Sequence, residues 1–68
     1  PRAAPALGLS QREQEVLDLV LDGLNNKRIA TQLDISVATV KTHLSNIFRK
    51  AEVGSRFELA RRVERDAR

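Results

Sequence analysis

The chain of 68 residues contains no cysteine, methionine, tryptophan or tyrosine, and it contains one histidine. Without cysteine, neither a disulfide nor a thiolate-bound zinc ion can stabilise the fold, and one histidine excludes a multi-histidine metal site. The aromatic side chains are Phe48 and Phe57, so a domain this small has to build its core from aliphatic residues. We therefore expect no metal and no cofactor, and the lack of cysteine suits a reducing cytoplasm.

Long apolar runs are also missing, which excludes a membrane-spanning helix. No positively charged segment followed by an apolar stretch predicts a secretion signal. Paired carboxylates, a glycine-rich phosphate loop and a nucleophile beside a base are all absent from the sequence, so an enzyme is not expected. Residues 1–8 hold both prolines, and we expect them to be the end of a linker before a single domain at residues 9–66.

Charge is distributed unevenly along the chain. Residues 1–25 carry two arginines against four carboxylates, a net charge of −2, whereas residues 26–68 carry ten basic against five acidic side chains, a net charge of +5. The segment from residue 36 to residue 50 contains no aspartate or glutamate. A basic half with an acid-free segment favours a polyanionic partner, although a solvated helix in a plain helical bundle can have the same composition.

Start signals predict four helices, and no segment alternates as a strand would, so we expect an all-α fold. Ser10 and Glu13 form a capping box before an apolar-periodic run, and Gly23 suits the end of that helix. Ser55 and Glu58 form a second box before the last helix. The first three predicted helices cover about residues 11–22, 25 or 26 to 33, and 37–50, and the fourth begins at residue 55 and includes residue 63.

The connection between the second and third predicted helices consists of little more than Asp34 and Ile35. Two helices joined by so short a turn form a helix-turn-helix. Glycine is common in that turn, and Asp34 can adopt the same backbone conformation in its place. Ile35 is then expected to fill the space between the two helices.

The helix at 37–50 has two chemically different sides. Its apolar side holds Val37, Val40, Leu44, Ile47 and Phe48, and its opposite side holds Ala38, Lys41, Thr42, Ser45 and Arg49. Fourteen residues span roughly 21 Å, and an α-helix fits the major groove of DNA. Small side chains let the backbone approach the bases, while Lys41 can reach a guanine edge or a phosphate. Each residue alone also has a purely structural explanation, so the prediction depends on the joint pattern.

Three motifs carry a resemblance to a known family. They read L-S-Q-R-E-Q-E-V-L at 9–17, G-L-N-N-K-R-I-A at 23–30, and I-S-V-A-T-V-K-T-H-L-S-N-I-F-R-K at 35–50. The chain resembles, over about residues 9–60, the LuxR-type helix-turn-helix domain, the DNA-binding output domain also found in NarL/FixJ response regulators. Three departures stand out: Asn25 replaces a usual Ser or Thr, Leu21 replaces a common Ala, and Ala51 with Glu52 replaces a usual Leu-Gly.

The resemblance implies a bacterial transcriptional regulator that binds double-stranded DNA in the cytoplasm, at the nucleoid. It implies a C-terminal output domain behind a sensor or receiver domain, with the third helix as the recognition helix. Base contacts are expected from Lys41, Thr42 and Ser45. Contacts to the phosphate backbone are expected from Asn26, Lys27, Ser36, Thr39, His43, Asn46 and Lys50. The first-helix carboxylates are expected to be structural, with Glu13 closing the cap and Glu15 pairing with Arg28 or Arg49.

The fourth helix is expected to pair weakly with its copy in a two-fold dimer on an inverted repeat. We predict that Phe57 and Ala60 close the core and that Leu59 and Val63 form the dimer contact, although Leu59 and Val63 could instead complete the core.

A helical protein-docking module that reuses the fold is the alternative function. A membrane-surface helix fits poorly because no large apolar face is present.

Overall fold

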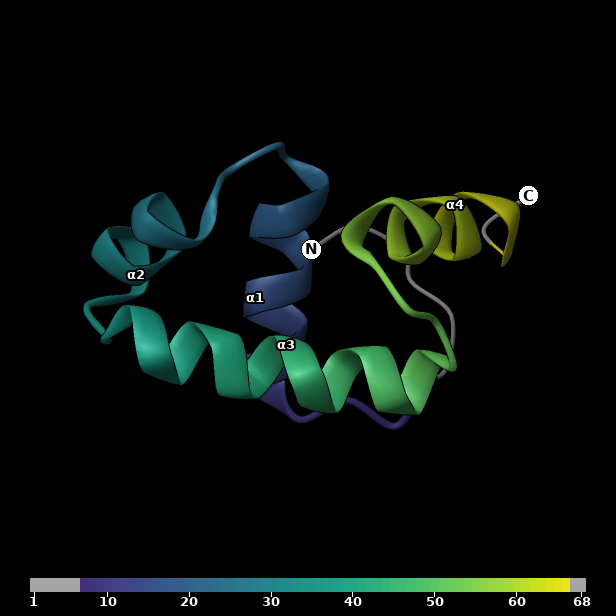
Figure 1. Ribbon diagram of the computed structural model, residues 1–68, viewed down its shortest axis with the longest axis horizontal. Helices are drawn as coiled ribbons and strands as arrows, with labels where there is room; N and C mark the ends of the chain where they lie inside the picture. Colours follow the sequence, from purple (N-terminus) through teal and green to yellow (C-terminus); the bar gives the residue numbers. More distant parts are fainter. Residues whose placement is uncertain (1–6, 67–68) are drawn as a thin grey trace.

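The computed structural model describes residues 7–66 of the chain, and among these residues it contains four helices and no strand (Figure 1). The helices are α1 (Gln11–Leu21), α2 (Asn26–Leu33), α3 (Val37–Ala51) and α4 (Arg56–Asp66). The all-α prediction is confirmed, and each predicted helix is present with ends within a residue or so of those expected. The segment at residues 1–6, most of the predicted linker, lies outside the described residues.

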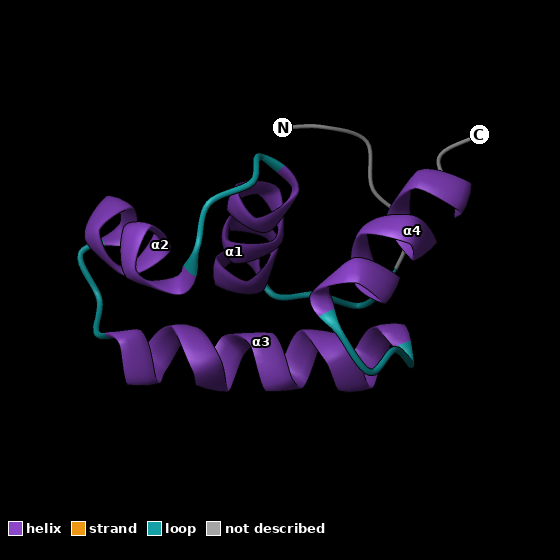
Figure 2. Ribbon diagram, turned by 45° about the horizontal axis from the view of Figure 1, so that its top comes forward, coloured by secondary structure: helices purple, strands orange, loops and turns teal. Residues whose placement is uncertain are grey.

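The longest helix, α3, is the one on which the other helices are arranged. Figure 2 shows α1, α2 and α4 together on one side of α3, with its opposite side uncovered. The helix α3 packs most extensively against α1 and α2, and α4 packs against the C-terminal part of the same helix. A helix covered on one side and open on the other is the arrangement that the predicted recognition helix requires.

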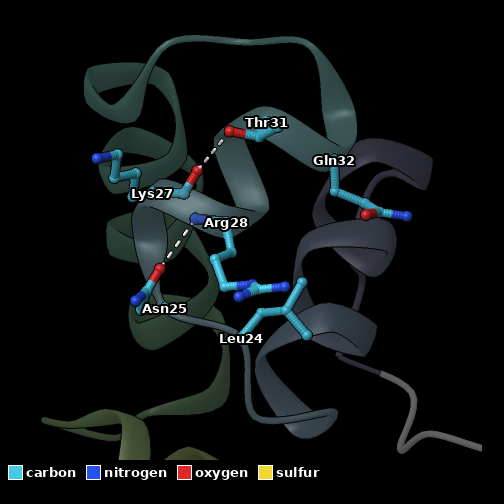
Figure 3. A pocket seen from close by; sticks show the side chains of 6 residues that line it. All are labelled: Leu24, Asn25, Lys27, Arg28, Thr31 and Gln32. Atoms are coloured by element: carbon cyan, nitrogen blue, oxygen red, sulfur yellow. Dashed lines mark hydrogen bonds between the residues drawn. The ribbon is translucent and has the colours of Figure 1, made fainter.

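Side-chain caps start the first three helices, as predicted. Ser10 Oγ accepts from the Glu13 amide at 3.1 Å, and Glu13 Oε1 accepts from the Ser10 amide at 2.9 Å, which completes the capping box. Asn25 Oδ1 accepts from the Arg28 amide at 2.9 Å (Figure 3). Ser36 Oγ accepts from the Thr39 amide at 3.0 Å. Each cap satisfies a backbone donor that the first turn leaves unpaired.

Three helices end through one left-handed residue each, but only one of these is glycine. Gly23, Asp34 and Glu52 have φ angles of 90°, 57° and 57°. After each of them, the next amide reaches back to the helix, to the carbonyls of Leu19, Ala30 and Phe48, at 3.0–3.1 Å. This six-to-one hydrogen bond defines the Schellman motif. Asp34 therefore adopts the turn conformation predicted for it, and Glu52 ends α3 without the glycine that the family usually has there.

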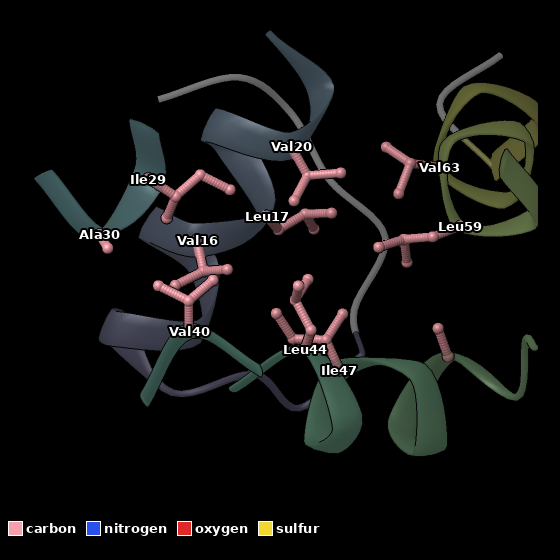
Figure 4. Close-up of a cluster of buried hydrophobic side chains, with 11 residues drawn as sticks. Val16, Leu17, Val20, Ile29, Ala30, Val40, Leu44, Ile47, Leu59 and Val63 are labelled. Carbon is pink, nitrogen blue, oxygen red and sulfur yellow. The ribbon is translucent and has the colours of Figure 1, made fainter. Parts of the chain in front are cut away.

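An aliphatic core joins all four helices (Figure 4). Its buried members are Val16, Leu17, Val20, Ile29, Ala30, Val40, Leu44, Ile47, Ala51, Leu59 and Val63. The apolar residues that follow the three Schellman turns, Leu24, Ile35 and Val53, pack against this cluster. Leu7, which belongs to the predicted linker segment, packs against this cluster as well.

The predicted facing of the fourth helix is wrong. Leu59 and Val63 are 0% and 4% exposed and belong to the core, whereas Phe57 is 69% exposed. Figure 4 shows Leu59 and Val63 directed from α4 towards Leu17 and Val20 of α1. Side chains enclosed in this way cannot form a contact with a second copy, so their assignment as dimer residues fails with the facing.

Two smaller predictions about carboxylates also need correction. Glu58 does not close a capping box on Ser55; Ser55 Oγ accepts from the Glu58 amide, but the Glu58 carboxylate accepts from the Gly54 amide at 2.7 Å. Glu15 pairs with Arg12, at 3.2 Å, because residues three apart share one face of the same helix.

Candidate nucleic-acid interface

The exposed side of α3 carries the three residues predicted to contact bases. Lys41, Thr42 and Ser45 are all exposed, while Val40, Leu44 and Ile47 between them are buried. Thr42 Oγ1 donates to the Ala38 carbonyl at 3.1 Å, which fixes its rotamer and leaves its oxygen as an acceptor. Within residues 7–66 the Lys41 ammonium is neither hydrogen-bonded nor ion-paired, and it therefore remains available to an outside acceptor.

The N-terminus of α3 lies at the same open side. Ser36 and Thr39 are both exposed, and their hydroxyl oxygens are 2.9 Å apart. Because Ser36 Oγ also accepts from the Thr39 amide, this pair of hydroxyls orders the first turn of the helix. Ser36 and Thr39, which we predicted to contact the DNA backbone, thus have a structural role within the helix. Because both are exposed, they are also accessible to a phosphate.

Residues at the start of α2 approach the exposed side of α3. Lys27 is exposed, whereas Asn26 is half-buried. A shallow groove between the two helices is lined by Asn26, Lys41, Leu44, Ser45, Phe48 and Arg56. The structure therefore brings together two predicted base-contacting residues and one predicted backbone-contacting residue, from segments fifteen or more residues apart in the sequence.

His43 and Asn46 lie on the flank of α3 and are half-buried. Asn46 Oδ1 accepts from Arg49 Nη2 at 3.0 Å, which leaves its amide nitrogen as a donor. Arg49, exposed one turn from Ser45, adds positive charge to this flank. Both predicted residues border the exposed side without occupying its centre.

Lys50 has a different environment from the other predicted phosphate ligands. Its ammonium contacts Glu13 Oε1 at 2.6 Å and the Gly8 carbonyl at 3.3 Å, and its side chain is 33% exposed. Hydrogen bonding from Lys50, followed by that from the Ser10 backbone amide, holds the pKa of the Glu13 carboxyl below its usual value. Lys50 therefore connects the C-terminal end of α3 to the start of α1, a role that the sequence analysis did not predict.

A second hollow lies on the outer side of α2 and is lined by Leu24, Asn25, Lys27, Arg28, Thr31 and Gln32 (Figure 3). Thr31 Oγ1 donates to the Lys27 carbonyl at 3.1 Å, so this hydroxyl is used within the helix.

In the part of the chain that the structure describes, no group of three or more histidine or acidic side chains is placed to bind a metal ion. None of the described helices combines the length and apolar character needed to cross a membrane.

The sequence profile of the bacterial regulatory proteins of the luxR family matches residues 7–63. The chain belongs to the luxR family. The match begins at Leu7, the first residue seen to pack on the core, and it includes every predicted interface residue. The predictions of an all-α helix-turn-helix fold, of this family and of a DNA-binding regulatory domain are confirmed.

Curated relatives of this luxR-family domain are named as regulators. The chain is 55% identical to the monoamine regulon transcriptional regulator of Klebsiella aerogenes, over 87% of this chain and 26% of that protein. It is 54% identical to the response regulator protein TmoT of Ectopseudomonas mendocina, over 84% of this chain and 26% of that protein. The chain thus spans about a quarter of the length of these relatives.

Solved structures of response regulators have the same fold as this luxR-family domain. The response regulator StyR matches with a TM-score of 0.79 and 47% identity, over 84% of this chain and 29% of that one. ChrA, a response regulator of a heme-sensing two-component system, matches with a TM-score of 0.81 and 40% identity, over 98% of this chain and 31% of that one.

Proposed function

We propose that this luxR-family domain binds double-stranded DNA sequence-specifically by inserting α3 into the major groove. One observation carries the proposal: α3 buries one side on the three other helices and exposes the opposite side, and no acidic residue occurs from position 36 to position 50. Lys41, Thr42 and Ser45 supply the base contacts, because they are exposed at the centre of the open side.

Phosphate contacts are proposed around these three residues, on the two strands that border the groove. The proposed ligands are Asn26, Lys27, Ser36, Thr39, His43 and Asn46. Lys27 provides an exposed charge, and the amides and the imidazole provide N–H donors. Of the two hydroxyls, the one that accepts within the Ser36–Thr39 pair keeps its hydrogen for a phosphate. Lys50 contributes chiefly by holding α3 against α1, because its ammonium already has two acceptors.

The test uses duplexes selected by the 68-residue chain from a random pool, followed by measurement of affinity at low and high salt. We expect Lys41→Ala to weaken binding to the selected duplex by about 1–3 kcal/mol and to relax the preference at one base position. Arg12→Ala is the matched control, since it removes one exposed positive charge from α1, on the covered side of α3.

Unchanged affinity and unchanged base preference in Lys41→Ala would show that Lys41 does not contact a base. If the wild-type chain retains no duplex at either salt concentration, the DNA-binding proposal fails. The protein-docking module then becomes the better explanation, with the exposed Phe57 as its natural anchor.

In the whole protein we propose that the domain is the output part of a bacterial transcriptional regulator, in the cytoplasm and at the nucleoid, controlled by an upstream sensor or receiver domain. The support is that the chain covers only about a quarter of relatives named as response regulators and transcriptional regulators. A form of the protein that includes the upstream part should bind the selected duplex only when that part is activated. Equal binding with and without activation would contradict the proposed control.

A weak two-fold dimer on an inverted repeat is also proposed, now through the exposed side of α4. Phe57 is the large apolar residue there, and Arg61 lies over its ring at 5.8 Å from the centroid. Phe57→Glu should abolish cooperative occupancy of a duplex with two half-sites and preserve binding to one half-site. Cooperative occupancy equal to that of the wild type would exclude this surface.

A further inference from the structure

Arg56, the first residue of α4, connects two helices that are far apart in the sequence. Its guanidinium donates from Nη1 to Asn26 Oδ1 at 2.5 Å and from Nη2 to the Leu24 carbonyl at 2.7 Å. The side chain is half-buried, and it lines the same groove as Lys41 and Ser45. Arg56 therefore contacts the start of α2 at the point where that helix approaches the exposed side of α3.

The chemistry of this contact fixes which way the Asn26 amide is turned. A guanidinium has donors and no acceptor, so the Asn26 atom that faces it has to be the oxygen. The amide nitrogen, with both of its hydrogens, is then on the side away from Arg56. In the absence of Arg56, the two ends of the amide group could exchange places at little cost, because they are nearly equal in size and shape.

The position of the amide gives this orientation a consequence. Asn26 borders the groove whose other residues are Lys41, Leu44, Ser45, Phe48 and Arg56. A DNA strand beside the exposed side of α3 presents phosphate oxygens, which accept hydrogen bonds and repel a carbonyl oxygen. The Asn26 side chain can bind them only when its amide nitrogen is directed outward.

We propose that Arg56 is a positioning residue for DNA recognition, which orients the Asn26 amide so that Nδ2 donates to a phosphate. This inference rests on the proposed DNA binding and names a residue outside the proposed set of contacts. An arginine is needed because two acceptors, one on a side chain and one on the main chain, are bound by one planar fork. A lysine keeps the charge and is also a pure donor, but its single nitrogen cannot reproduce the two-nitrogen fork, so the Leu24 carbonyl competes with Asn26 Oδ1 for it and the amide is no longer fixed.

The experiment is a double-mutant cycle on the selected duplex with Arg56→Lys and Asn26→Ala. We expect each single change to weaken binding about tenfold, the equivalent of one charge-assisted hydrogen bond. The double variant should bind no more weakly than Asn26→Ala alone. The salt dependence of Arg56→Lys should equal that of the wild type, because the charge is kept.

Arg62→Lys is the matched control, since Arg62 also belongs to α4 and its guanidinium also donates to a main-chain carbonyl, that of Ala51, outside the groove. It should leave DNA affinity unchanged. All affinities are measured at a temperature at which circular dichroism shows every variant fully helical.

Losses that add in the double variant, wild-type affinity in Arg56→Lys, or an equal loss in Arg62→Lys would each overturn the inference. These results leave the Lys41→Ala effect intact, so they are distinguishable from a failure of DNA binding itself. A direct phosphate contact by Arg56 predicts instead that Arg56→Gln, but not Arg56→Lys, lowers the salt slope by about one. That outcome would also overturn the positioning role.

Discussion

Replacement of Glu13 by glutamine tests the connection between α1 and α3. The Glu13 side chain is nearly buried, and one of its oxygens accepts from both the Ser10 amide and the Lys50 ammonium. Glutamine keeps the size and the oxygen but removes the charge. A charge-assisted hydrogen bond contributes about 1.5–3 kcal/mol and a neutral one about 1 kcal/mol. Because Lys50 is one-third exposed and can be rehydrated, we expect Glu13→Gln to lower stability by about 1–2 kcal/mol.

Thermal unfolding followed by circular dichroism measures this loss. In a domain of this size, each kcal/mol shifts the melting temperature by about 4–8 °C, so the expected decrease is about 4–16 °C. Glu15→Gln is the matched control on the same helix. Its ion pair with Arg12 joins side chains that are 43% and 45% exposed, and such pairs contribute about 0–1 kcal/mol. Equal shifts in the two variants would refute the reasoning.

The pH dependence gives the same prediction a second readout. The pKa of Glu13 is lower in the folded state than the usual 4.5, mainly because Lys50 donates to the carboxylate. Such a group stabilises the fold above its unfolded pKa, and the contribution is lost as the pH falls through the folded value. The difference in melting temperature between wild type and Glu13→Gln should therefore shrink below pH 4.5. A difference that stays constant down to strong acid would contradict the assignment.

Three further changes test the rest of the fold and its surface. Glu52→Gly should raise stability by about 1 kcal/mol in thermal melts, because an L-residue at φ 57° is strained and a carboxylate at a helix C-terminus is unfavourable. A lowered melting temperature would contradict this prediction. Leu44→Asp should abolish helical circular dichroism, since an unpaired buried carboxylate costs several kcal/mol. A normal melt would show that the facing of α3 is wrong. Lys27→Ala should weaken all duplexes alike and lower the salt slope by about one, and selective loss of one sequence would exclude a phosphate contact.

Local signals in the sequence were enough to predict most of the fold. Caps such as Ser10, Asn25 and Ser36 act within three residues of themselves, so the sequence reveals where α1, α2 and α3 begin. The facing of α3 was also predictable, because a long helix with apolar residues at regular spacing has only one consistent buried side. The exposure of Lys41, Thr42 and Ser45 follows from that facing.

Tertiary contacts account for what the sequence did not predict. The eleven residues of α4 offer two possible apolar pairs, and the choice depends on how the helix packs against α1 and α3 rather than on its own periodicity. The three-residue spacing of Phe57 and Ala60 suggested the wrong pair. The contacts of Lys50 with Glu13 and of Arg56 with Asn26 join residues 37 and 30 positions apart, and no local pattern marks either pair.

The division of α3 into a covered and an open side has a consequence for the evolution of such regulators. Substitutions at Lys41, Thr42 or Ser45 leave the core residues Val40, Leu44 and Ile47 in place, so folding imposes little constraint on them. If these three residues contact bases as proposed, two copies of the domain can acquire different target sequences after gene duplication while both remain stable. Under the proposed mode of DNA binding, the exposed side of α3 can therefore diverge more quickly than the core that supports it.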